Sequence, residues 1–145
     1  MKHFHFFDEQ FQSSIVEDLR SGAVFFHGFQ GDEPKLDDNQ SLWLSLDEGE
    51  ALRYSRFGTK KQTGGVLILS LKSDRSALVG NPNGHQYLAS IASTDHRFFA
   101  KSLQSWAMNN GTHLVKENNT CYIAFCAKSD FDVHSVNKWS NRGTS

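Results

Sequence analysis

The chain has 145 residues, of which 38% are hydrophobic, 21% are charged and 12% are aromatic. This length suits one compact domain with its own core, and the share of aromatic rings excludes a disordered chain. With 15 Lys and Arg against 16 Asp and Glu, the formal net charge is −1, which disfavours a protein that binds nucleic acid through a basic face.

Apolar spacing predicts a helix in the first residues and a strand after it. Four large apolar residues recur at every fourth position: Phe7, Phe11, Ile15 and Leu19. This spacing is typical of one helix face, and Gly22 marks its end. Residues 23–27 predict a short buried strand that ends at Gly28. The polar residues 30–41 predict an exposed loop.

A second strand and a second helix are expected next. The apolar run at 42–44 predicts the strand, and Ser45 with Glu48 three residues later predicts a capping box at the start of the helix. Acidic residues in the first turn, with Arg53 and Arg56 in the last, suit the dipole of that helix.

The remaining chain is expected to hold one more helix among strands. In order, the sequence predicts a basic loop over 60–65, a strand over 66–71, mixed residues over 72–93 and a helix over 95–109 that ends at Gly111. That helix buries four residues: Phe99, Leu103, Trp106 and Ala107. Further strands are expected over 113–116, 120–125 and 131–136.

These elements define the expected fold class. Helices and short strands are interspersed without regular βαβ spacing, and turn-rich segments connect them. The sequence therefore predicts an α+β protein with largely antiparallel strands. No internal repeat or linker interrupts residues 1–136, which we expect to form a single domain. Residues 137–145 are polar, and we expect a frayed tail there.

The cysteines and the first residues bear on the compartment. If Cys121 and Cys126 lie in one strand, their Cα atoms are about 16 Å apart at about 3.3 Å per residue, whereas a disulfide needs about 7 Å or less. Two free thiols are typical of a reducing cytosol. The sequence has neither an apolar run of about 18 residues nor a signal peptide. We therefore expect a cytoplasmic protein, in the cell that makes it or in a host, with no membrane partner.

Several familiar site motifs are missing from the sequence. It contains no GxxxxGK[ST] phosphate loop, no GxGxxG dinucleotide fingerprint and no GxSxG nucleophile elbow. His3 and His5 would share one face of a strand, but no paired cysteines or HExxH segment accompany the seven histidines. We therefore expect no metal site.

The first feature that carries chemistry is the pair His27 and Gly28. A histidine at a strand end can present its ring at the rim of a cleft, and glycine lets a ligand approach its backbone closely. The plain structural alternative is that His27 is only a polar end to a buried strand.

The second feature is a pair of rings, and the third is a carboxylate. Trp43 and Tyr54 could hold a flat heterocycle between them, and the small Ala51 would let their helix pack closely. Glu117 lies in a turn before a strand with a polar edge. Alternatively, the two rings are ordinary core or boundary aromatics, and Glu117 is a solvated turn residue.

The order of these features resembles that of the ADP-ribosyltransferases, specifically the histidine-type branch of diphtheria toxin and the poly(ADP-ribose) polymerases. Phe26-His27-Gly28 is similar to the aromatic-His-Gly element of that branch. The segment 43–54 is similar to its following strand and helix, including the separation of the two aromatics, and residues 113–125 are similar to its closing segment. The resemblance covers most of residues 23–136. It implies a split antiparallel β-sandwich with a few short flanking helices.

Two departures from the family pattern stand out. Trp43 replaces the usual tyrosine, but an indole still stacks. The closing strand has no glutamate where the family has its catalytic one, because Thr120 and Cys121 stand there. The nearest carboxylate along the chain is that of Glu117.

The resemblance implies NAD as the substrate and assigns it several binding residues. His27 would hydrogen-bond a ribose hydroxyl, and the Gly28 backbone would hold the nicotinamide carboxamide. Trp43 and Tyr54 would stack on the positively charged nicotinamide ring. Ser45 belongs with these cofactor-binding residues.

The resemblance also implies the catalytic residues His27, Tyr54 and Glu117. Cleavage of the nicotinamide–ribose bond leaves a cationic ribose, which the Glu117 carboxylate would support while it orients a hydroxyl or the incoming nucleophile. Lys60 and Lys61 would steer the pyrophosphate.

Three functions are open at this point. The first is an ADP-ribosyltransferase that modifies a macromolecule, a protein rather than a nucleic acid, as a toxin or effector. The second is a binding module on the same fold that has lost catalysis together with the strand glutamate. The third is a relative that uses NAD differently, such as an NAD glycohydrolase or an RNA 2′-phosphotransferase.

Overall fold

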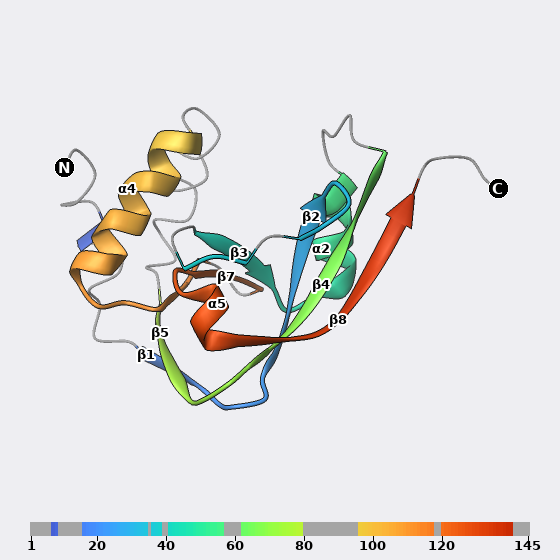
Figure 1. Cartoon of the computed structure of the whole chain (residues 1–145). Coiled ribbons are helices and arrows are strands. Elements are labelled where there is room, and N and C mark those ends of the chain that lie inside the picture. The colour runs from blue at the N-terminus through green and yellow to red at the C-terminus, as the bar shows by residue number, and fades with distance from the viewer. Residues whose placement is uncertain are drawn as a thin grey trace.

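The structure, a computed structural model, is mixed α+β, which confirms the predicted class. It describes residues 7–8, 16–34, 36–38, 41–56, 62–79, 96–117 and 120–140. Most of the described elements are strands, which join in one curled sheet with helices beside it (Figure 1).

The elements have the following bounds. The strands are β1 (Val16–Leu19), β2 (Val24–Gln30), β3 (Leu42–Ser45), β4 (Thr63–Leu71), β5 (Arg75–Val79), β6 (Leu114–Lys116), β7 (Cys121–Ala124) and β8 (Phe131–Ser140). The helices are α2 (Glu48–Arg56), α4 (His96–Asn109) and the short α5 (Ala127–Asp130).

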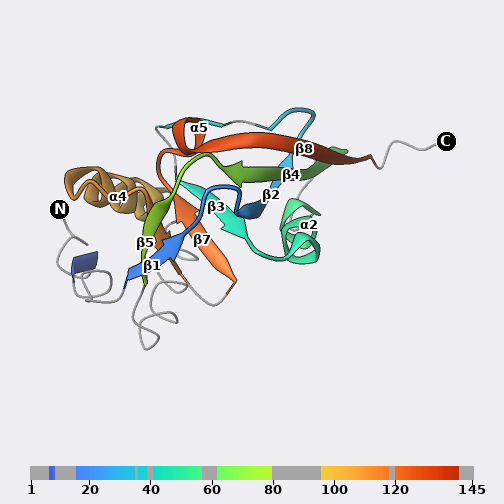
Figure 2. The same cartoon turned by 90° about the horizontal axis from the view of Figure 1, so that it is seen from below.

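The sheet divides into two halves at one weak joint. Its strand order is β1-β5-β6-β7-β3-β2-β4-β8, and β5–β6 is the parallel pair while the other neighbours are antiparallel. β2 pairs with β4 along its whole length, but it meets β3 at the single pair Phe26↔Ser45. Figures 1 and 2 show β2, β4 and β8 running together on one side, with β5, β7 and α4 on the other.

A core of aromatic and aliphatic side chains ties the two halves together. Phe25 of β2 meets Tyr122 of β7 edge-on, with ring centroids 5.3 Å apart, and Phe131 of β8 at 5.6 Å. Leu44 and Leu69 are buried in the same cluster. Because these rings come from both halves, burial holds the sheet together where backbone pairing does not.

A second apolar cluster lies under α4. Leu103, Trp106 and Ala107 are buried there, as the sequence predicts, and they pack with residues of β6 and β7. The Trp106 Nε1 donates a hydrogen bond to Asp8 Oδ1 at 2.8 Å. The side chain of Phe99, the fourth predicted core residue, lies outside the described residues.

The predicted helix that starts at Phe7 is wrong in its last part. Phe7 and Asp8 are helical, and residues 9–15 lie outside the description. Val16–Leu19 form β1, which pairs with β5 from Val16↔Leu78 to Leu19↔Arg75. Apolar residues at every fourth position are typical of a helix face. Here the backbone hydrogen bonds of residues 16–19 are instead made with β5, a strand distant in the sequence that the sequence did not predict.

Three strands are longer than predicted, and in two of them, β2 and β4, glycines give a misleading loop signal. β2 continues through Gly28, so His27 lies inside the strand and not at its end. β4 begins at Thr63 and β8 continues to Ser140, so residues 137–140 are strand and not a frayed tail. Glycines that look like loop signals sit inside paired strands because a neighbour lies too close for a side chain.

The glycines of β4 show this close approach. A Cβ at Gly64 would lie 2.7 Å from Trp139 Cζ2, and one at Gly65 would lie 2.3 Å from Asn137 O. Trp139 is 9% exposed, and its Nε1 donates to Ser55 Oγ at 2.8 Å. The glycines are therefore the surface on which the end of β8 packs.

Both cysteines, Cys121 and Cys126, have free thiols, as predicted.

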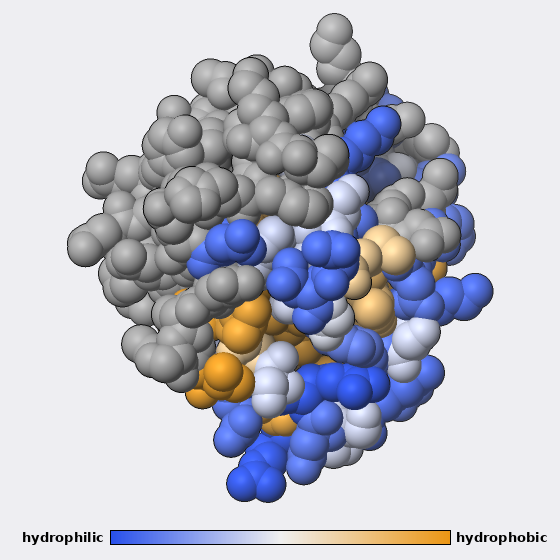
Figure 3. Space-filling model, turned by 90° about the vertical axis from the view of Figure 1, so that its left-hand side faces the viewer, coloured by the Kyte–Doolittle hydropathy of each residue, from blue (hydrophilic) through white to orange (hydrophobic). Residues whose placement is uncertain are grey.

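Among the described helices, none is long and apolar enough to cross a membrane. On the face that Figure 3 shows, hydrophilic side chains surround a smaller apolar area in the described part of the surface.

Candidate functional site

His27 lies where β2 and β3 part, and its ring bridges the two strands. Its Nδ1 is 2.8 Å from the carbonyl oxygen of Trp43. Since a carbonyl only accepts, Nδ1 carries the hydrogen. Burial lowers the pKa of the imidazole below its ordinary value, although the bond to Trp43 opposes this. The ring is therefore neutral at pH 7, with Nε2 left as an acceptor.

Gly28 is the position at which α2 lies against β2. A Cβ there would lie 2.1 Å from the carbonyl oxygen of Ala51 and 3.0 Å from the nitrogen of Ser55. Ala51 is 1% exposed, so the close packing predicted for it is confirmed. On this face of β2, the helix occupies the space that the sequence reading gave to a ligand.

The two aromatic rings of the predicted sandwich have different surroundings. Trp43 is half-buried and packs against the apolar cluster under α4, whereas Tyr54 is 61% exposed on α2. Among the described residues, the rings of Trp43 and Tyr54 make no contact with each other. Tyr54 instead lies near acidic groups.

Those acidic groups help to raise the pKa of the Tyr54 phenol. Burial is the largest cause that raises it, and Cys121, Glu50 and Glu117 raise it further by their charges, while Arg53 lowers it. The phenol therefore keeps its proton and lies near two carboxylates. Of these, the sequence predicted only Glu117.

Glu50 is the residue that sequence reasoning missed. Its Oε1 accepts from Ser45 Oγ at 3.0 Å, from Cys121 Sγ at 3.1 Å and from Thr120 Oγ1 at 3.3 Å, and its Oε2 lies 3.4 Å from Thr120 Oγ1. Ser45 and Cys121 are register partners on β3 and β7, so their side chains share a face. The Glu50 carboxylate thus lies at the opening of β7.

A signal for Glu50 was present in the sequence. It precedes Tyr54 by four residues on a predicted helix, and such residues share a helix face. The predicted capping box obscured it, because it assigned Ser45 to Glu48. Ser45 Oγ in fact accepts from the nitrogen of Asp47 at 3.0 Å, and Glu48 accepts from Asn137 Nδ2 at 2.9 Å.

Glu117 lies in the turn before β7, near enough to the Glu50 carboxylate for the two charges to interact. Its backbone nitrogen donates to the carbonyl of Cys121 at 2.9 Å. Burial raises the pKa of its carboxyl, and the charge of Glu50 raises it further. The two carboxylates are therefore electrostatically coupled.

Cys121 is not a nucleophile in this setting. Burial, the hydrogen bond to Glu50 and the charge of that carboxylate raise the pKa of its thiol to about 12. A thiol that keeps its proton serves here as a donor to Glu50.

Two groups of predicted residues lie in parts of the chain that the structure does not describe. Lys60 and Lys61, expected to steer a pyrophosphate, and His3 and His5, considered as metal ligands, all lie outside the described residues.

A different trio, found in the described part of the chain, has metal-ligand types. The ligand atoms of His113, Cys126 and Asp130 lie within 4.8 Å of one another. Asp130, whose side chain is 0% exposed, already accepts from His113 Nδ1 at 2.8 Å and pairs with Arg75 Nη2 at 3.1 Å. A guanidinium at that distance repels a second cation, so the buried Asp130 carboxylate serves here as the partner of Arg75 and His113.

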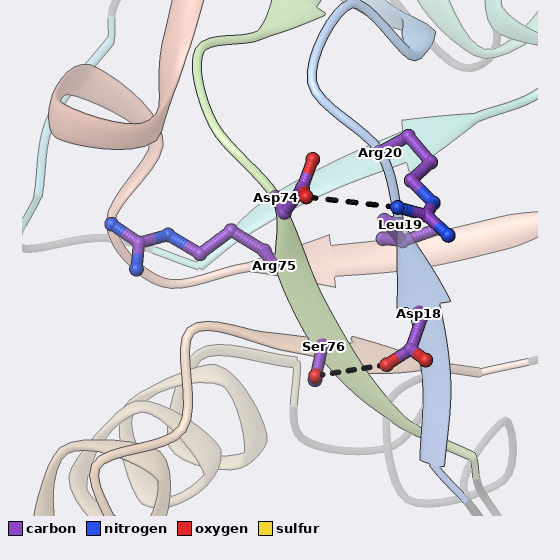
Figure 4. A pocket seen from close by; sticks show the side chains of 6 residues that line it. All are labelled: Asp18, Leu19, Arg20, Asp74, Arg75 and Ser76. Atoms are coloured by element: carbon purple, nitrogen blue, oxygen red, sulfur yellow. Dashed lines mark hydrogen bonds and ion pairs between the residues drawn. The ribbon is translucent and has the colours of Figure 1, made fainter.

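A surface hollow of about 400 Å³ lies between β1 and β5, away from the predicted site residues. Its lining residues are Asp18, Leu19, Arg20, Asp74, Arg75 and Ser76 (Figure 4). Arg20 pairs with Asp74 at 3.9 Å, Ser76 donates to Asp18 at 3.3 Å, and Arg75 points away from β1. These polar groups contact one another and form no converging site.

Comparison with known proteins adds no assignment. Neither the family models nor the curated proteins with which the sequence was compared match this chain. β3 is central to the candidate site, because Trp43 holds the His27 ring and Ser45, two residues later, holds the Glu50 carboxylate.

Proposed function

We propose that the protein is an NAD-dependent ADP-ribosyltransferase. It breaks the nicotinamide–ribose bond of NAD and transfers ADP-ribose to a macromolecular target, a protein, in the cytoplasm of the producing cell or of a host in which it acts as a toxin or effector. The observation that carries the proposal is the link through β3, which joins a neutral His27 to the Tyr54 and carboxylate group.

The sheet supports the fold that this function requires. The proposed fold is a split antiparallel β-sandwich of the ADP-ribosyltransferase type, with NAD between its two small sheets. One register pair, Phe26↔Ser45, joins β2 to β3, and a sheet that divides there supports such a fold.

His27 and Gly28 bind the nicotinamide riboside part of NAD in this proposal. The neutral imidazole, held by Trp43 through Nδ1, accepts a hydrogen bond from a ribose hydroxyl at Nε2. The backbone of Gly28 bonds the carboxamide, which offers one donor group and one acceptor, at the edge of β2 beyond its single pair with β3 and not on the face that α2 covers. Both contacts use atoms that do not change their protonation at pH 7.

The aromatic residues and Ser45 hold the reacting ring. The exposed Tyr54 ring stacks on the cationic nicotinamide, and the Trp43 indole faces it from β3. Ser45 was expected to contact the cofactor. Its hydroxyl already donates to Glu50, so its part in the proposal is to orient that carboxylate at the ribose.

The chemistry is the transfer of a glycosyl group. The C1′–N bond breaks and its electron pair leaves with nicotinamide, which becomes neutral, while the ribose C1′ becomes cationic. A carboxylate near C1′ stabilises that charge, and Glu117 is the acidic residue that the sequence offered for it. A lone pair of the target then bonds C1′, and the proton of the target group is released.

The test is nicotinamide release from NAD. The wild type should release nicotinamide, and His27→Ala should slow the release about 100-fold. His134→Ala, at an exposed histidine of β8, serves as the matched control and should keep the wild-type rate. A wild type that binds no NAD at millimolar concentration would rule out the proposal.

A second candidate, a non-catalytic NAD-binding module, is favoured by Thr120 and Cys121, which stand where the family has its strand glutamate. Binding without nicotinamide release would support this module. Release without transfer to any protein would support a glycohydrolase.

A further inference from the structure

We propose that Glu50, on α2, is the carboxylate that stabilises the ribose cation in place of a strand glutamate, and that Glu117 accepts the proton of the incoming nucleophile. This inference rests on the proposed function and names the catalytic carboxylates of the same site. It assigns a role to a residue that the sequence reading left out.

The first argument is position. Thr120 and Cys121, the two residues that replace the strand glutamate, both contact the Glu50 carboxylate, at 3.3 and 3.1 Å. The strand has no glutamate at these two positions, and the Glu50 carboxylate, which projects from α2, lies beside them instead. Glu117 is near, but it enters from the turn before β7.

The second argument is preorganisation. Three side-chain donors, on Ser45, Thr120 and Cys121, converge on Oε1 of Glu50 at 3.0 to 3.3 Å. The nearest of these donors to Oε2 is Thr120, at the longer distance of 3.4 Å. An oriented carboxylate needs no rearrangement when positive charge develops beside it, which is the property that electrostatic catalysis requires.

The third argument is the shared helix. Glu50 and Tyr54 are one turn apart on α2, so a stacking ring and a carboxylate project from one face. The helix is fixed to β2 by the contact of Ala51 with Gly28. The elements that place the nicotinamide ring thus also place the carboxylate beside the ribose.

The two carboxylates divide the work because their surroundings differ. The charged and titratable groups that interact with Glu117 are Glu50 and Tyr54 of α2 and Cys121 of β7, and Arg53 of α2 acts on Tyr54 with the opposite sign. The Glu50 carboxylate already accepts hydrogen bonds from three side chains, whereas Glu117 enters the site from the turn before β7. Burial and the charge of Glu50 raise the pKa of Glu117, which suits a group that takes up a proton.

The proposed reaction transfers the ADP-ribosyl group from nicotinamide to the nucleophile of the target. The C1′–N bond electrons leave with nicotinamide, and the cationic C1′ lies against Glu50. The nucleophile donates a lone pair to C1′, and its proton passes to the Glu117 carboxylate and then to solvent. The products are neutral nicotinamide, the ADP-ribosylated target and one proton.

The experiment compares three glutamine variants of equal size. Glu50→Gln keeps an oxygen for Ser45 and Thr120, so it should fold, and melting temperature checks this. It should bind NAD within threefold of the wild type but release nicotinamide at least about 100-fold more slowly. Glu117→Gln should lower the rate less and remove its decline toward acid pH. Glu48→Gln, at an exposed glutamate of the same helix, should match the wild type.

The outcomes separate this inference from the proposed function. If the wild type neither binds nor cleaves NAD, the proposed function fails before any variant is compared. If the wild type cleaves NAD and Glu50→Gln does so equally fast, the function stands and the assignment of Glu50 is wrong. A wild type that binds NAD without cleaving it also overturns the assignment.

Discussion

At the residue scale, ionisable side chains owe their behaviour to a few close neighbours. His27 is held neutral by burial, Glu117 is pushed toward its protonated form beside Glu50, and the buried Asp130 is compensated by His113 and Arg75. The first two belong to the candidate site, whereas the third holds the structure. Stability measurements should therefore distinguish them.

Replacement of Asp130 should destabilise the fold strongly. Asp130→Ala removes the buried partner of the Arg75 guanidinium and of the His113 ring and should cost about 3 kcal/mol of unfolding free energy. Glu33→Ala breaks an exposed ion pair with Lys138 and should cost under about 0.5 kcal/mol. Urea unfolding measures both, and equal losses would show that Asp130 is not a structural ion pair.

His27 should make stability depend on pH. Its folded pKa lies below the ordinary 6.5, so the unfolded chain takes up the proton first as pH falls. The stabilisation is full above pH 6.5 and is lost as pH falls through the folded pKa. Between pH 7 and 5.5, the melting temperature of the wild type should fall more than that of His27→Gln. Parallel curves would contradict a neutral buried imidazole.

At the element scale, α2 is placed by a glycine in the strand beneath it. Gly28→Ala would put a methyl group 2.1 Å from the Ala51 carbonyl oxygen and should cost about 3 kcal/mol, because the helix must move. Gly49→Ala, on the same helix, meets no atom closer than 3.6 Å and should stabilise by about 0.5 kcal/mol. Thermal unfolding of the pair tests this, and a neutral Gly28→Ala would refute the close packing.

The sequence predicted elements whose signals are local. α4 was found because Leu103, Trp106 and Ala107 follow a helical period, and the core of β2 was found from an apolar run. β1 and β5 were missed, since their pairing joins residues far apart in the chain and leaves little local pattern. Gly64 and Gly65 predict a loop although they lie in β4, because a glycine needed for packing looks like a glycine needed for a turn.

The candidate site was predictable to a similar degree. His27, Trp43 and Tyr54 could be named from type and order, but the burial that neutralises His27 depends on the tertiary fold. Glu50 was missed because its partners, Thr120 and Cys121, are about half the chain away. Its spacing from Tyr54 was the only local clue.

At the scale of the whole molecule, one half of the sheet is fastened to α2 by a residue near the end of the last strand. Trp139 of β8 packs on Gly64 of β4 and donates to Ser55 of α2, so one ring joins three elements. The side chain of Arg56 adds to this contact, with its Cζ 5.1 Å from the centre of the ring.

Trp139 should therefore matter to the whole fold. Trp139→Ala removes a buried ring and its hydrogen bond and should cost about 3 kcal/mol. Its neighbour Lys138 is exposed, so Lys138→Ala should cost under about 0.5 kcal/mol. Equal melting temperatures for the two variants would show that β8 is dispensable beyond Val136.

The single pair between β2 and β3 has a mechanical consequence. Under a force that pulls the two halves of the sheet apart, β2 and β3 would separate before β2 and β4, because one pair of partners resists instead of the whole run from Val24 to Gln30. α2 crosses this joint, because it contacts Gly28 of β2 on one side and Ser45 of β3 on the other. Helix α2, which carries Glu50 and Tyr54, therefore spans the weak joint between the two halves of the sheet. A molecule bound by this helix would stiffen the sheet as a whole.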